Sequence, residues 1–311
     1  MANQNRKKAI TTKEDWESLN YPKHGKKTLV VYFSQLNPIG RECHAKVKEE
    51  VVTEASKLVG EEVDIDIAKL DEFLVDIYGK DKMEVKFYRN QKASEIENRL
   101  VKLAKNGWEY EAFFFVFLTY LDDEKQSGVR IQAYDKAIHL DFLFNPIKNA
   151  PSMALKPKIF LIQADDIGML YPTHVEKAIP DHIEVKKIPT DADRLVILST
   201  IPQKLTPLAD KERDKEKGKQ TPENDSDSHQ NIRAGPVQSV VPRFDTSVLI
   251  RAFLTVMNND DYRGENLLSN STRILGEVCN IVEPLQNTTD YDNYDIPLPL
   301  VTSTLTKLYF L

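Results

Sequence analysis

The chain has 311 residues, of which 41% are hydrophobic and 9% aromatic, enough to build a substantial core in one large or two modest domains. A formal net charge of −6 argues against a surface for nucleic acid or an anionic membrane, which would need clustered lysine and arginine. Two cysteines make a disulfide framework unexpected. With no bilayer-spanning apolar segment and no secretory pattern at the start, we predict a soluble, reduced, cytoplasmic protein.

The first half of the chain alternates between strand and helix patterns after a flexible tail at 1–25. The strand patterns are short apolar runs, and the helix patterns place apolar residues on one side of a charged segment. Strands are predicted at Lys27–Phe33, Lys82–Phe87 and Ala112–Leu118, and helices at Glu42–Leu58, Ile65–Ile77 and Ser94–Lys105.

The helix at Ser94–Lys105 carries the clearest start and stop signals. Ser94 and Glu97 have the spacing of a capping box, in which each side chain accepts from an orphan backbone N–H group. Asn106 and Gly107 are typical of a helix end.

The stretch Lys156–Asp166 is the one around which the rest of the chain is organised. Its apolar run, Ile159–Ala164, is typical of a strand buried on both faces of a parallel sheet. Asp165 and Asp166 follow directly. In open α/β sheets the chemistry lies just beyond the carboxyl ends of such strands, so this is the candidate site.

The second half of the chain contains a sharp change of composition. A loop at 168–187 leads to a strand at Arg194–Ser199, and a charged insertion of about 204–240 follows, too poor in aliphatic residues to order itself. After it we predict a short amphipathic helix from Thr246 to Met257, a second helix at Leu267–Val282, and two short strands at the end of the chain. A short amphipathic segment is also predicted at Leu140–Phe144. Strands alternating with helices indicate an α/β sandwich with a mainly parallel sheet.

Five segments of the chain resemble the caspase family, and they occur in the family's order. IFLIQADD resembles the caspase signature strand, which carries the catalytic cysteine in Q-A-C-[RQG]-G. The other matching segments are NYPKHGKKTLVVYF, AFFFVFLTYL, IPTDADRLVILSTIP and IPLPLVTSTLTKLYFL. The resemblance implies a caspase-like sandwich of about six strands, of the short-prodomain type, with a large-subunit-like region at 26–167, an intersubunit linker at 168–187 and a small-subunit-like region at 188–311.

The resemblance also assigns the positions at which this chain departs from the family. Asp165 stands at the cysteine position, Tyr120 at the histidine position and Leu121 at the oxyanion glycine position. A carboxylate and a phenol cannot replace a thiolate and an imidazole at neutral pH. We therefore predict no catalytic residue, no cofactor and no metal, and a pseudoenzyme rather than an enzyme. Gln163 and Arg243 are predicted to be remnants of the substrate pocket.

The resemblance further implies pairing through the last strand of the chain. Family members dimerise there, and an unpaired edge strand would be prone to aggregation. The predicted interface residues are Pro299, Leu300, Val301, Thr302, Ser303 and Thr304. We expect a heterodimer with a catalytically active caspase paralogue, whose activity in apoptosis would be raised; a homodimer is also open.

Two alternatives remain at this point. The chain could be an inhibitory decoy that sequesters caspases or their regulators. Less favoured is a metal-dependent hydrolase that uses Asp165 and Asp166, because acidic residues at the end of a strand can bind Mg²⁺. Against it, neither a glycine-rich phosphate loop nor a spaced third carboxylate is evident in the sequence.

Overall fold

The structure is a computed structural model of the chain. It describes residues 17–36, 38, 64–122, 128–148, 150–166, 192–201, 246–286 and 297–311. The predicted helix at Glu42–Leu58, the loop at 168–187, the charged insertion and Arg243 lie outside these residues. The division into large- and small-subunit-like regions stays a prediction.

A six-stranded sheet in the order β2-β1-β3-β6-β7-β8 forms the centre of the fold. Neighbours from β2 to β7 pair in parallel, and β8 runs antiparallel to β7. This confirms the predicted mainly parallel sheet. The strands are β1 (Lys27–Ser34), β2 (Met83–Arg89), β3 (Tyr110–Tyr120), β6 (Lys158–Asp165), β7 (Arg194–Ser199) and β8 (Leu300–Ser303).

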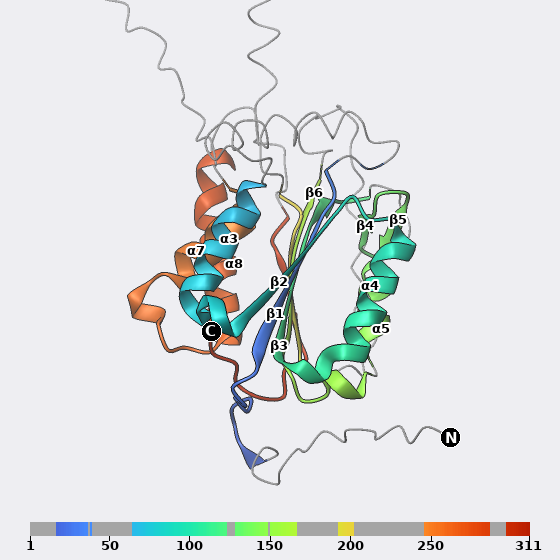
Figure 1. Cartoon of the computed structure of the whole chain (residues 1–311). Coiled ribbons are helices and arrows are strands. Elements are labelled where there is room, and N and C mark those ends of the chain that lie inside the picture. Colours follow the sequence, from blue (N-terminus) through green and yellow to red (C-terminus); the bar gives the residue numbers. More distant parts are fainter. Residues whose placement is uncertain are drawn as a thin grey trace, which may run out of the picture.

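Helices cover both faces of this sheet, as Figure 1 shows. On one side, called the α3 face, lie α3 (Ile65–Tyr78), α7 (Val248–Met257) and α8 (Leu267–Gln286). On the other, the α4 face, lie α4 (Ala93–Asn106) and α5 (Leu140–Lys148). The short 3-10 helices are η1 (Lys80–Lys82), η2 (Gly107–Glu109), η3 (Pro151–Met153) and η5 (Asp260–Tyr262). In the described part of the chain, no helix has the length and apolar character needed to span a membrane.

The central strands are buried on both faces because their sequences are apolar at consecutive positions. Every residue of β6 and β7 is buried, and so is every residue of β1 except Lys27. Side chains alternate between faces, so Phe114 and Val116 of β3 join the core under α3, α7 and α8, whereas Phe113 and Phe115 join the core under α4 and α5.

Aromatic rings form the centre of the core on the α4 face. Phe160 of β6 stacks on Phe115 of β3, with ring centroids 4.8 Å apart, and meets Phe144 of α5 edge-on at 4.9 Å. Such contacts stabilise a core beyond the burial of their area. They fix α5 against the two strands whose carboxyl ends form the candidate site.

Two predicted details were wrong. The helix α4 begins one residue earlier than expected, and Glu95, not Glu97, completes its cap by accepting the N–H of Lys92 at 2.8 Å. The chain end forms one strand, β8, followed by an isolated bridge between Asn20 and Leu308, instead of two strands.

A small hairpin was also absent from the prediction. Strands β4 (Arg130–Gln132) and β5 (Ala137–His139) pair in antiparallel fashion beside the carboxyl end of β3. Each strand has three residues, too few to show a period-2 pattern in the sequence.

Candidate functional site

The candidate site lies where β3 and β6 end side by side. Tyr120 and Asp165 are the last residues of these strands and are register partners across the parallel pair. By alternation, both side chains project from the α3 face, as do those of Leu118 and Leu161, which belong to the core there. The sheet thus brings together the two residues that stand at the predicted histidine and cysteine positions.

Asp165 is a buried acceptor held by its neighbour. Its side chain, 5% exposed, accepts a 2.6 Å hydrogen bond at Oδ1 from Nε2 of Gln163, two residues earlier on the same face of β6. The same amide nitrogen donates to the carbonyl of Ile201 at 2.6 Å. Gln163 therefore links the end of β6 to the segment that follows β7.

The amide oxygen of Gln163 differs from the amide nitrogen in its hydrogen bonding. Oε1 is buried and has no hydrogen-bond partner among the residues that the structure describes. A buried amide oxygen without a donor is costly, so this atom marks a place where a further donor would stabilise the site.

Tyr120 is turned toward the end of β1. Its hydroxyl donates a 3.0 Å hydrogen bond to the carbonyl of Leu36, and its side chain is buried. The backbone reinforces this connection, because the N–H of Gln35 donates to the carbonyl of Leu118 at 2.9 Å. The phenol therefore joins the carboxyl ends of β1 and β3.

At the carboxyl ends of β3, β6 and β7, called the rim of the sheet, backbone N–H groups donate to backbone carbonyls. The N–H of Leu121 donates to the carbonyl of Asp165 at 3.0 Å, and that of Asp166 donates to the carbonyl of Thr200 at 2.8 Å. These bonds extend the β3–β6–β7 pairing by one residue at each strand. In this conformation the N–H at the predicted oxyanion position is engaged within the fold.

An ion pair that the sequence did not predict joins the hairpin to the end of β3. Arg130 of β4 and Asp122, which follows β3, lie 3.3 Å apart, with side chains only 15% and 4% exposed. Leu121 forms an isolated bridge with Ile131, which sets the hairpin beside it. Strands of three residues gave no usable sequence signal for this hairpin.

The structure divides the remaining predicted site residues into two groups. Pro299 is buried and Val301 and Thr304 are half-buried, whereas Leu300, Thr302 and Ser303 are exposed on β8. In the described residues no group of three or more His, Cys, Asp or Glu side chains could hold a metal ion. The roles predicted for Tyr120, Leu121, Gln163 and Asp165 stay predictions.

With this geometry in hand, comparisons with known proteins define the class of the chain. A family model described as the caspase domain matches residues 53–231, more than half of the sequence. The chain therefore belongs to the caspase family. No curated protein sequence matches it.

Solved caspase structures resemble it in fold. A structure described as pro-sf-caspase-1 superposes with a TM-score of 0.60 at 17% identity, covering 96% of this chain and all (100%) of that one. Caspase-1 from Spodoptera frugiperda superposes with a TM-score of 0.54 at 18% identity, covering 94% of this chain and 93% of that one. Together with the sheet order, this confirms the predicted caspase-like fold.

The prediction that this chain is a pseudoenzyme and not an enzyme is wrong. The matched model describes a peptidase family, so membership places the chain with cysteine proteases. The side chains at two positions, Asp165 and Tyr120, do not by themselves decide the enzyme class. The short-prodomain type and the cytoplasmic location stay predictions.

Proposed function

We propose that this caspase-family protein regulates a catalytically active caspase in apoptosis by pairing with it through β8, and that pairing raises the partner's activity. The proposal concerns what the chain does to its partner and is independent of any cleavage by the chain itself. A single observation carries it: β8 lies at the edge of the sheet with an exposed apolar side chain.

The edge position of β8 leaves one side of the strand available. It pairs with β7 on one side, and in the described part of the chain no strand lies on its other side. Val301 packs against the core of the α3 face, while Leu300 is 37% exposed. Unpaired edge strands pair readily with another strand, and an antiparallel β8–β8 contact would join two such sheets.

A four-residue strand is too small to hold two proteins together by itself. The neighbouring helix α8 packs against β8, so its outer surface would lie in the same interface. Stable interfaces bury roughly 1,200–2,000 Å² in total, which a strand and an adjoining helix of 20 residues can supply.

The path from β8 to the rim of the sheet is short. β8 pairs with β7, and the residues after β7 accept hydrogen bonds from the end of β6: Thr200 from the N–H of Asp166, and Ile201 from the amide of Gln163. A caspase partner with the same sheet order would have the corresponding path. Pairing at β8 could therefore favour one arrangement of the carboxyl ends of the partner's strands, provided that this protein binds the partner more tightly in that arrangement.

The test mixes this protein with a catalytically active caspase and follows cleavage of a peptide substrate. We expect a complex of one chain of each by size-exclusion chromatography with light scattering, and a rise in cleavage rate that saturates. Allosteric coupling of about 1–3 kcal/mol corresponds to a change of roughly 5–150-fold. A fall in rate would instead establish the inhibitory alternative, and an unchanged rate with the complex formed would overturn the proposal.

Matched edge variants show whether β8 is the contact. Leu300→Asp and Thr302→Lys place charges on β8, where we expect loss of the complex and of the rate change. Val85→Asp is the control, because Val85 is similarly exposed, at 43%, on β2 at the opposite edge of the same sheet. If Val85→Asp and Leu300→Asp weaken the complex equally, β8 is not the contact.

A further inference from the structure

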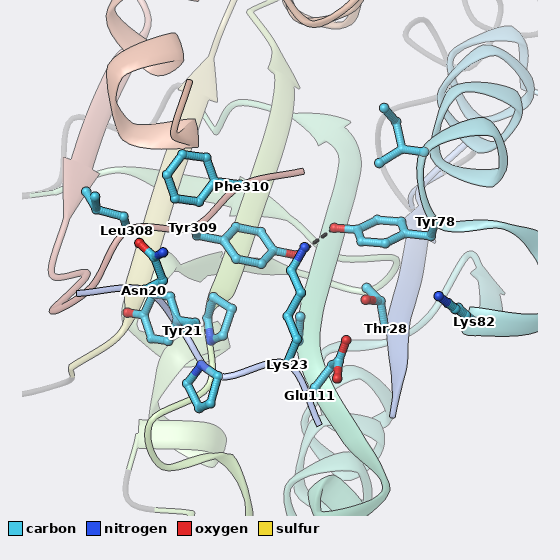
Figure 2. A pocket seen from close by; sticks show the side chains of 14 residues that line it. Asn20, Tyr21, Lys23, Thr28, Tyr78, Lys82, Glu111, Leu308, Tyr309 and Phe310 are labelled. Carbon is cyan, nitrogen blue, oxygen red and sulfur yellow. Dashed lines mark hydrogen bonds between the residues drawn. The ribbon is translucent and has the colours of Figure 1, made fainter. Parts of the chain in front are cut away.

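A pocket lies at the end of the sheet opposite the candidate site. It is a pocket of about 500 Å³ at the amino ends of β1 and β3, where Thr28 and Ala112 contribute to its lining. The candidate site lies at the carboxyl ends of these strands, beside Leu36 and Tyr120. Figure 2 shows the pocket from close by. Its volume is within the roughly 300–1,000 Å³ typical of small-molecule sites.

Both ends of the described chain build the walls of this pocket. The segment around Tyr21 and the segment around Leu308 are joined by backbone hydrogen bonds of 3.2 Å, from Tyr21 N–H to the Leu308 carbonyl, and 2.8 Å, from Leu308 N–H to the Leu19 carbonyl. The carbonyl of Tyr309 accepts the N–H of Leu267 at 2.7 Å, which ties this wall to the start of α8. The pocket is therefore held by ordered backbone.

One wall is aromatic and electrically neutral. The hydroxyl oxygens of Tyr78, the last residue of α3, and Tyr309 lie 2.5 Å apart, and the rings of Tyr21 and Tyr309 meet edge-on with centroids 6.2 Å apart. Burial raises the pKa of both Tyr78 and Tyr309, so both remain phenols near neutral pH. Such a wall suits an aromatic ring.

Among the described residues that line the pocket, two are positively charged and one is negatively charged. Lys23 and Lys82 line it, and neither ammonium group has a carboxylate partner among the described residues. Figure 2 labels Lys23, Lys82 and Thr28 among the side chains that line the pocket. Glu111 also lines the pocket; its Oε2 accepts the N–H groups of His24 and Lys26, each at 3.0 Å, and its negative charge helps to raise the pKa of Tyr78 and Tyr309.

We propose that this pocket binds a small aryl phosphate, with the phosphate between Lys23 and Lys82 and the ring against the Tyr78–Tyr309 wall. A phosphate monoester carries a charge of about −1.5 to −2 at pH 7, and the two ammonium groups outweigh the single carboxylate of Glu111 in attracting it. The aromatic wall explains why the ligand should carry a ring as well as an anion. The site is separate from β8, so the proposal stands apart from the pairing proposed above.

Calorimetric titration of the full chain with three probes tests the ligand class. Phenyl phosphate carries both parts of the proposed ligand, inorganic phosphate only the anion, and benzyl alcohol only the ring. We expect phenyl phosphate to bind at least about tenfold more tightly than either of the others. Absence of phenyl phosphate binding at millimolar concentration, or equal binding of inorganic phosphate, would overturn the proposal.

Lysine variants test the location. The double variant Lys23→Met/Lys82→Met should weaken phenyl phosphate binding by about tenfold or more, because both ammonium groups are lost. Lys80→Met is the matched control: Lys80 is an exposed lysine of η1, two residues from Lys82, and does not line the pocket. Equal affinity of the double variant and the control would refute this location.

Salt dependence tests the charge without any substitution. Raising the salt concentration from about 50 mM to about 500 mM shortens the range of electrostatic attraction and should weaken phenyl phosphate binding several-fold. Thermal unfolding of each variant without ligand checks that the fold is intact. Affinity that does not change with salt would contradict the role given to the two lysines.

Discussion

The hydroxyl of Tyr21 donates a 2.8 Å hydrogen bond to Oδ1 of Asp193, although 172 residues separate the two. Asp193 is buried and also accepts a hydrogen bond from the hydroxyl of Thr306. Its backbone N–H donates to the carbonyl of Thr304, and its carbonyl accepts the N–H of Lys158, both at 2.8 Å. One residue before β7 therefore joins both ends of the described chain to the start of β6.

Substitution of Tyr21 tests how much this connection stabilises the fold. Tyr21→Phe removes a hydroxyl that donates to a carboxylate and also accepts the N–H of Thr306 at 3.2 Å. We expect the free energy of unfolding to fall by about 2 kcal/mol, since a hydrogen bond to a charged group contributes roughly 1.5–3 kcal/mol. Urea denaturation measures the change.

Tyr134→Phe is the control for that experiment. Tyr134 is half-buried, and its hydroxyl takes part in none of the side-chain hydrogen bonds of the described residues. Its loss should change the free energy of unfolding by less than about 0.5 kcal/mol. Equal effects of the two substitutions would show that the Tyr21–Asp193 hydrogen bond does not contribute measurably to the free energy of unfolding.

Gln163 is expected to contribute to the free energy of unfolding through its two hydrogen bonds at the rim of the sheet. Gln163→Met keeps a similar volume but removes the N–H donors to Asp165 and to the Ile201 carbonyl, leaving two buried acceptors short of a donor. We expect a loss of about 2–3 kcal/mol in urea denaturation. Gln132→Met is the comparison, because the buried Gln132 amide donates one bond, to the Ala133 carbonyl. A smaller effect at Gln163 than at Gln132 would contradict this account.

Lys156 should make stability depend on pH. Burial lowers the pKa of its ammonium group from 10.5 to about 8, and the charges of Lys26 and Lys158 add to the effect. Between these two values the unfolded chain binds more protons than the folded one, so the free energy of unfolding rises with pH in this window. The ammonium is partly exposed and donates to the Gly107 carbonyl at 2.6 Å, which favours the charged form, so we expect a rise of only about 1 kcal/mol.

The measurement compares wild type with Lys156→Met by urea denaturation at several pH values. The difference in free energy of unfolding between the two proteins should change by about 1 kcal/mol, in favour of wild type, from about pH 7.5 to about pH 10. Lys105→Met, at an exposed position of α4, controls for the loss of a lysine. A difference that stays constant with pH would rule out a buried titrating ammonium at this position.

Phe160 should be among the most sensitive positions of the core. Its ring contacts those of Phe115 and Phe144, and it is fully buried. Phe160→Ala is expected to cost about 3–5 kcal/mol, from lost burial and the cavity left behind. Phe87→Ala, at a β2 position that is 44% exposed, should cost about 1 kcal/mol or less. Comparable losses at both positions in denaturant unfolding would be inconsistent with the described core.

The sequence predicts local elements well where burial leaves a pattern. The strands β1, β3, β6 and β7 were predictable because each is an apolar run too short for a helix. Boundaries were less certain, since the cap of α4 depends on which carboxylate reaches which N–H: Glu95 accepts from Lys92, and Asp135 accepts from Ala93 at 2.8 Å. Asp135 lies in the turn between β4 and β5, which the sequence did not reveal.

By itself, the sequence determined the alternation of strands and helices, the resemblance to caspases, and the placement of Tyr120 and Asp165 at the ends of two core strands. Tertiary structure alone decided that Gln163 bridges Asp165 to Ile201, that Tyr21 meets Asp193, and that a charged aromatic pocket forms where the two ends of the described chain meet. The physical reason is range. Burial repeats about every two residues in a strand and about every 3.6 residues in a helix, so a short stretch of sequence reveals it. A hydrogen bond between residues 172 positions apart depends on the whole path of the chain.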